Sequence, residues 1–173
     1  MSIVNSSTIG VNLGASDGAT ALFGLGQTVT GSDGSQWIYV NATSALTTGM
    51  VLAVTTAYSA QPATASNLLG SALLAAGSPN NGETLAFAQG LFSAADYGWV
   101  CLRGANQYVA VSNVSTLGCA LYLSVNSGML TTTAASGTVA GIILLTCTGS
   151  TVLAPQKAYL QYPRLQAGAL LGV

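Results

Sequence analysis

Few side chains in this sequence could perform acid–base or nucleophilic chemistry. It contains four carboxylates (Asp17, Asp33, Glu83 and Asp96), a single lysine (Lys157) and no histidine. Without histidine the commonest general base is missing, so Ser-His-Asp and Cys-His catalytic arrangements are excluded. No Ser-x-x-Lys pattern ends at Lys157, which disfavours a serine–lysine device. We therefore predict no catalytic residues and a protein that is not an enzyme.

The positions of the carboxylates suit turns better than a site. Asp17 and Asp33 each precede a glycine, and Glu83 follows a turn sequence, so we expect solvated turn residues rather than the paired acids of a glycoside hydrolase. A calcium-binding loop would gather several acidic residues within about a dozen positions. We expect no metal and no cofactor, with a structural calcium ion at an Asp-Gly turn as the alternative left open.

Three cysteines, Cys101, Cys119 and Cys147, lie at wide and irregular spacing inside apolar stretches. Zinc would need a fourth ligand, and the sequence has neither a histidine nor a CxxC pair. We expect buried free thiols that behave as small hydrophobic side chains, and a disulfide is the alternative.

The composition is nearly free of charge. Only 4% of the 173 residues are charged, and the net charge is −1, whereas an ordinary soluble domain is roughly a quarter charged. Three basic residues cannot form a nucleic-acid surface. The best apolar run, 139–147, is interrupted by Gly141 and is far too short to span a bilayer, so we expect no membrane contact. With no signal peptide visible, we expect synthesis in the cytoplasm.

Short apolar runs separated by Gly, Asn, Asp and Pro predict an all-β fold. We expect one compact β-sandwich or barrel-like domain of about eight to ten short strands over residues 21–165. An extended N-terminal arm (1–20) precedes it and an apolar C-terminal tail (166–173) follows it. A helix is plausible only over 68–76. Strands are expected over 27–30, 36–42, 49–56, 84–89, 97–102, 107–112, 120–125, 129–133, 139–147 and 151–153.

Two adjacent strand pairs are predicted to form hairpins. The sequence RGAN at 103–106 is expected to turn between 97–102 and 107–112, and NSG at 126–128 between 120–125 and 129–133. The second hairpin carries the clearer alternation, with Leu121 and Leu123 on one face and Tyr122 on the other. The run 139–147 is continuous enough to predict burial on both faces.

Aromatic and basic residues are the candidates for recognition. The aromatics at strand positions are expected to pack in the core or between subunits, or else to form a carbohydrate-binding platform; they are Trp37, Tyr39, Tyr97, Trp99, Tyr108 and Tyr122. An arginine in an otherwise neutral interface often holds a carbonyl or a partner carboxylate. The candidate interface residues are Arg103, Tyr162, Arg164, Leu170 and Leu171.

Several short segments, taken in order, carry a family resemblance: DGSQWIYV at 33–40, YGWV at 97–100, GML at 128–130, GII at 141–143 and YLQYPRL at 159–165. Over roughly 32–165 the chain resembles the small decoration (cement) proteins on the heads of tailed double-stranded DNA bacteriophages. The likeness rests on strands and glycine turns and includes no diagnostic motif. The apolar tail after residue 165 has no place in it.

The resemblance implies a β-rich protein on the outer capsid surface of the virion, made in the bacterial host. It would bind the major capsid protein and itself, commonly as a homotrimer, and stabilise the expanded shell. The N-terminal arm would add a strand to a capsid sheet, with its aliphatic side chains in shallow pockets. Those side chains are Ile3, Val4, Ile9, Val11 and Leu13. The alternative is a carbohydrate-binding or adhesive module on a virion or cell surface.

Overall fold

The fold is seen in a computed structural model that describes residues 7–8, 11–64, 84–113, 115–124, 128–133, 138–147 and 155–166. These residues contain strands and no helix, which confirms the predicted all-β class. The strands are β1 (Ser7–Thr8), β2 (Val11–Asn12), β3 (Ser16–Gly18), β4 (Thr28–Thr30), β5 (Gln36–Ala42), β6 (Val51–Val54), β7 (Ser59–Pro62), β8 (Thr84–Phe87), β9 (Tyr97–Ala110), β10 (Leu121–Leu123), β11 (Leu130–Thr131), β12 (Thr138–Leu144) and β13 (Pro155–Gln166). Across the described ranges, no helix is long and apolar enough to cross a membrane.

Five strands close into a barrel. β5 pairs in parallel with β7, and antiparallel pairs β7–β6, β6–β8, β8–β9 and β9–β5 complete the circuit. One hydrophobic cluster takes residues from each of these five strands, among them Val40, Leu52 and Ala60, and so fills the space that they enclose. Alternate side chains of β5, β6, β8 and β9 point outward into a second cluster, which extends to β10, β11, β12 and β13.

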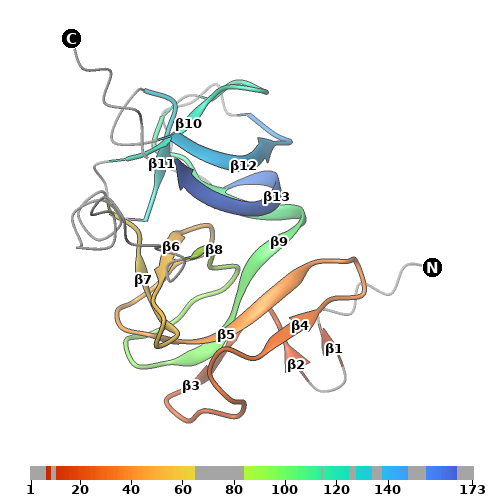
Figure 1. Ribbon diagram of the computed structural model, residues 1–173, viewed down its shortest axis with the longest axis vertical. Helices are drawn as coiled ribbons and strands as arrows, with labels where there is room; N and C mark the ends of the chain where they lie inside the picture. The colour runs from red at the N-terminus through yellow and green to blue at the C-terminus, as the bar shows by residue number, and fades with distance from the viewer. Residues whose placement is uncertain are drawn as a thin grey trace, which may run out of the picture.

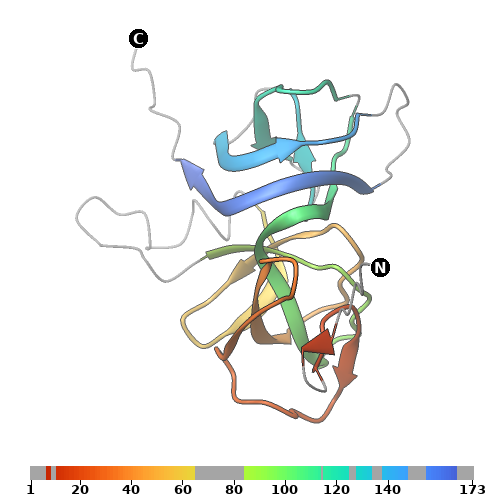
Figure 2. The ribbon, with the colours of Figure 1, turned by 90° about the vertical axis from the view of Figure 1, so that its right-hand side faces the viewer.

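The long strand β9 links the barrel to an outer layer of sheet. Its first half pairs with β5, and its second half pairs with β13, which in turn pairs with β12. Figure 2 shows β9 leaving the barrel and entering the layer that contains β12 and β13. The barrel and the outer layer therefore lie at opposite ends of the long axis of the molecule (Figure 1).

The predicted hairpin at 97–112 is wrong, because this segment is one continuous strand. Gly104 and Asn106 have φ of 156° and 58°, and the pairing between β9 and β13 shifts register between Ala158 and Leu160. The chain therefore bends through a bulge instead of reversing. A different partner strand holds each half of β9 extended. Gly104 and Asn106, which indicated a turn in the sequence, therefore form the bend between the two halves.

Of the other predictions made from the sequence pattern, some are confirmed and some are wrong. The strand 36–42 and the hairpin of β10 with β11 are confirmed. The expectation that 139–147 is buried on both faces is wrong, because Ile143 and Leu145 are 53% and 44% exposed. β13 was not predicted at all, although it is twelve residues long. The helix considered over 68–76 and the strand over 151–153 lie outside the described residues.

The N-terminal segment differs from the expected arm over 1–20. β1 and β2 form a small two-stranded sheet, and β3 pairs with the start of β9. Val11 and Leu13 are buried in the protein's own core. Apolar burial therefore draws the chain into the domain from Val11 onward, ten residues before the expected boundary.

Candidate interaction surface

The carboxylates lie apart, and each that the structure describes is engaged locally. Asp17, on β3, accepts a hydrogen bond from the Tyr39 hydroxyl at 2.7 Å, so it is not the solvated turn residue expected. Asp96 accepts one from the backbone N–H of Ser93 at 2.7 Å. Asp33 accepts hydrogen bonds from Ser35. Partial burial raises the pKa of Asp33, but these hydrogen bonds outweigh it and hold the pKa below its usual value.

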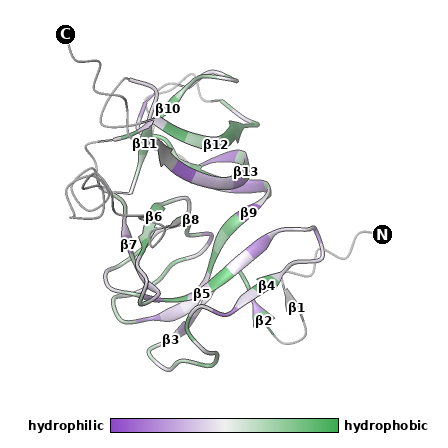
Figure 3. Cartoon of the chain, viewed as in Figure 1, coloured by the Kyte–Doolittle hydropathy of each residue, from purple (hydrophilic) through white to green (hydrophobic). Residues whose placement is uncertain are grey.

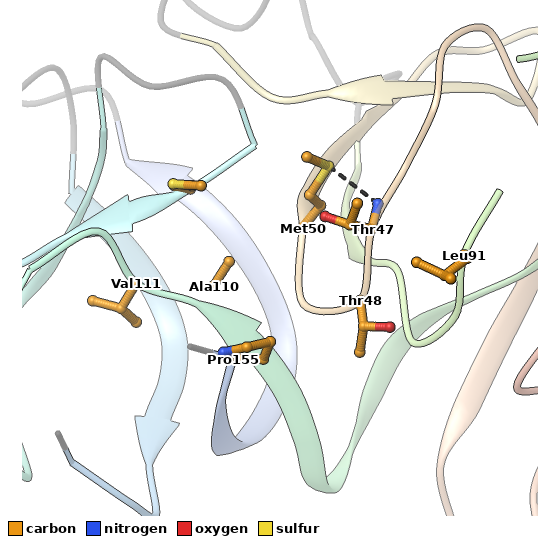
Figure 4. Close-up of a pocket in the computed structure, with 8 residues that line it drawn as sticks. Thr47, Thr48, Met50, Leu91, Ala110, Val111 and Pro155 are labelled. Atoms are coloured by element: carbon orange, nitrogen blue, oxygen red, sulfur yellow. Dashed lines mark hydrogen bonds between the residues drawn. The ribbon is translucent and has the colours of Figure 1, made fainter. Parts of the chain in front are cut away.

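The described ranges contain no group of three Cys, Asp or Glu side chains that could hold a metal ion. Glu83 lies outside them. A cavity of about 310 Å³ between the barrel and the outer layer is lined by apolar groups and two threonines, without a titratable side chain (Figure 4). The lining residues are Thr47, Thr48, Met50, Leu91, Ala110, Val111, Met129 and Pro155.

The largest aromatics belong to the core. Trp99 is 1% exposed and Tyr39 is fully buried, with ring centroids 5.0 Å apart, and Phe23 packs edge-on against both. Trp37 is also buried, and its indole N–H donates to the Ser35 hydroxyl at 2.7 Å. The structure therefore places Trp37, Tyr39 and Trp99 in core packing, whereas Tyr97 and Tyr122 are partly buried and Tyr108 is exposed.

The three cysteines are free thiols, but only Cys101 is fully buried; Cys119 is partly buried and Cys147 is exposed. The prediction of buried thiols is therefore wrong for Cys147, which follows the end of β12. Desolvation raises the pKa of Cys101 to about 12. This thiol is an inert part of the core.

The outer layer presents one solvent-facing surface of β9, β13 and β12. Register places Ile143 opposite Tyr159, and Tyr108 opposite Lys157, so these side chains share a face. Leu145 joins them, because its N–H bonds to the carbonyl of Lys157. We call these five residues the outer sheet face. Ile143, Leu145 and Tyr108 are each 40% exposed or more, and hydrophobic positions of β12 lie beside hydrophilic positions of β13 (Figure 3).

Two of the predicted interface residues meet at the edge of this face. The guanidinium carbon of Arg103 lies 5.7 Å from the centre of the Tyr162 ring, within the range of a cation–π contact. The Tyr162 hydroxyl donates to the side-chain oxygen of Gln36 on β5. Tyr162 has a φ of 49°, opposite a bulge at Gly141 in β12. These contacts hold Arg103 and Tyr162 on the surface of the bend between the two layers.

The remaining predicted residues are dispersed. Arg164 is exposed on β13, two residues beyond Tyr162. Val11 and Leu13 are unavailable to a partner because they are buried in the protein's own core, which corrects their assignment to the arm. Ile3, Val4, Ile9, Leu170 and Leu171 lie outside the described residues.

A second exposed surface, which the sequence did not indicate, lies at the far end of the barrel. Leu22 and Leu25 are 63% and 42% exposed, and Tyr58 is 39% exposed. The Leu22 N–H donates to the Tyr39 hydroxyl that also contacts Asp17, and the Tyr58 ring lies over Gly26. Asn41 contacts both the carbonyl of Asp96 and that of Tyr58. We call Leu22, Leu25, Tyr58, Asp17 and Asp96 the barrel-end patch.

Comparison with known proteins found no relative of this chain. No protein-family model, curated protein or solved structure matches the chain. A functional assignment therefore depends on the surfaces described above.

Proposed function

We propose that this chain is a structural protein of a virus particle, which decorates the outer surface of a bacteriophage head and stabilises contacts between major capsid proteins. The observation that supports this most is the outer sheet face, where apolar side chains stand exposed on rigid strands with Lys157 as the only charged member. Exposed apolar surface of this kind is typical of a protein that is covered by another protein.

The composition supports the same role. A surface with so little charge has weak repulsion between copies, which suits dense packing on a lattice. The described carboxylates do not gather into a metal-binding group, and the cavity is lined without a titratable side chain, which supports a binding role over a catalytic one. Under this proposal the protein associates with itself, as a homotrimer, and with the major capsid protein, after synthesis in the bacterial host.

The N-terminal residues are the proposed attachment to the shell. Because β1 already pairs with β2 and the chain joins the domain at Val11, the segment available for strand addition shortens from 1–20 to residues 1–6, with Ile3 and Val4 as its apolar side chains. Main-chain hydrogen bonds to a capsid strand would supply affinity, and these side chains would fix the register of the added strand.

The test is binding to undecorated heads of the virus that encodes the chain, observed by cryo-electron microscopy. The full chain is expected to add ordered density at defined lattice positions. Deletion of residues 2–6 should abolish it without lowering the unfolding temperature, because the deletion spares Val11 and Leu13. Replacing Ser2 and Asn5 with alanine is the matched control and should leave occupancy unchanged. A full chain that ignores the heads would refute the proposed function.

The carbohydrate-binding alternative has less support. The aromatic side chains that it would use are largely buried, with Trp99 at 1% exposure. Binding of the isolated protein to host polysaccharide, lost on replacing an exposed ring such as Tyr108, would nevertheless favour it over decoration of a capsid.

A further inference from the structure

Most charges of the described residues are segregated along the length of the protein; the exception is Asp33, which is exposed on the turn between β4 and β5, near Arg103. All three basic residues, Arg103, Lys157 and Arg164, lie on β9 and β13 and are exposed. Asp17 and Asp96 lie at the other end of β9, where β3 pairs with its first residues. At about 3.3 Å per residue, Arg103, the seventh residue of β9, lies about 20 Å along the strand from Tyr97, and Tyr108, which pairs with Lys157, lies further along it. The barrel end therefore carries two partly buried carboxylates, whereas the outer layer carries the three cations, with Asp33 near Arg103.

Each charged group accompanies exposed apolar side chains. The barrel-end patch combines Leu22, Leu25 and Tyr58 with Asp17 and Asp96. On the outer sheet face, Ile143 and Leu145 lie beside Lys157, with Arg103 at the edge. Like ends would place like charges together, whereas unlike ends would bring apolar surface against apolar surface and carboxylates near cations.

From this complementarity we propose that copies of the chain bind head to tail, the barrel-end patch of one copy docking on the outer sheet face of the next. This inference rests on the self-association that is part of the proposed function, and it assigns the two surfaces that meet. The contact is heterologous, because two different patches form it. Such contacts generate a ring when the rotation between copies closes, and an open chain when it does not.

Two single substitutions each disable one patch. Leu22→Lys places a cation where the basic face of the neighbour would dock. Ile143→Glu places an anion where the acidic patch would dock. Both side chains are more than half exposed, so the fold should tolerate either change. Leu117→Lys is the matched control: Leu117 is 61% exposed, and the adjacent loop residue Ser115 bonds to Gln156 on the opposite side of β13 from Lys157.

The experiment measures native mass by analytical ultracentrifugation with purified protein and no capsid present. Wild type and Leu117→Lys are expected to sediment as an oligomer of the 17.2 kDa chain. Leu22→Lys and Ile143→Glu should each weaken association by at least about 100-fold, since like-charge contacts at an interface cost several kcal/mol. Circular dichroism and unfolding temperature must match wild type for each variant.

Mixing the two variants decides whether the contact is head to tail. Each variant retains the patch that the other lacks, so an equimolar mixture should form a species of two chains, one of each variant. Two variants that each remain oligomeric alone, a mixture that stays monomeric, or a wild-type protein that is monomeric throughout the micromolar range would overturn the inference. Attachment of a monomeric wild type to heads would leave the proposed decoration role standing, whereas an oligomer that ignores heads would remove that role and leave the contact between copies.

Discussion

Replacing Gly141 with alanine tests whether the bulge in β12 supports the outer sheet face. Gly141 has a φ of 83°, a conformation that side-chain-bearing residues rarely adopt. A Cβ built there would lie 2.7 Å from the carbonyl oxygen of Gln161 on β13. The oxygen belongs to the backbone, so it cannot rotate away as a flexible side chain could.

Two costs add in this variant. The left-handed conformation costs a non-glycine residue about 1–2 kcal/mol, and the clash with the backbone adds about 1–3 kcal/mol. Gly118 provides a matched control, because its φ is 76° and a Cβ there would meet nothing within 4 Å. We expect Gly141→Ala to lower the free energy of unfolding by about 2–5 kcal/mol, and Gly118→Ala by about 1–2 kcal/mol.

Denaturant and thermal unfolding measure the difference. For a chain of this size each kcal/mol lowers the melting temperature by about 2–4 °C, so Gly141→Ala should lose about 4–20 °C and the control distinctly less. Equal losses in the two variants would show that the close approach between Gly141 and Gln161 does not constrain the sheet, and the argument for a rigid face would fail.

Three further outcomes are expected. Trp99→Ala should cost about 3–5 kcal/mol of folding free energy in chemical denaturation, because it empties a core position; an unchanged midpoint would contradict its burial. Alkylation followed by mass spectrometry should label Cys147 quickly in the folded protein and Cys101 only after unfolding. Burial raises the pKa of Cys101 from 9.0 and that of Tyr39 from 10.0, each to about 12, so the folded state holds these protons more tightly. The stability they contribute is complete below pH 9 and lost as pH rises toward 12; a denaturant midpoint that stays level over this window would refute it.

The local sequence pattern predicted the structure correctly where a short segment determines its own conformation. The strand at 36–42 is rich in aromatic and β-branched residues, and its predicted bounds match β5. The alternation of Leu121, Tyr122 and Leu123 placed the two leucines inward, as the structure has them. The turn predicted at 103–106 is wrong, because the glycine and asparagine there suit a bulge as well as a turn.

The surfaces could not be predicted, because they depend on pairing between distant segments. Sequence reasoning marked Arg103 and Tyr162 as candidate interface residues, but their contact requires β9 and β13 to pair, which brings together residues 59 positions apart (162 − 103). Leu22, Leu25 and Tyr58 carry no periodic signal, and Tyr58 reaches Gly26, next to Leu25, from 32 positions further along the chain (58 − 26). Val11 and Leu13 were assigned outward for the same reason, since a two-residue strand has no local pattern that reveals its burial.

The sequence by itself determined the scarcity of charge, the absence of histidine, which excludes Ser-His-Asp and Cys-His arrangements, and the alternating apolar segments, which predict an all-β domain. The tertiary structure decided where the barrel closes, that β9 bends through both layers, and which exposed side chains share a face. The physical reason is that composition and side-chain alternation are properties of neighbouring residues. Strand register is set by hydrogen bonds and burial between segments far apart in the chain, as in the contact between Tyr162 and Gln36, which are 126 positions apart.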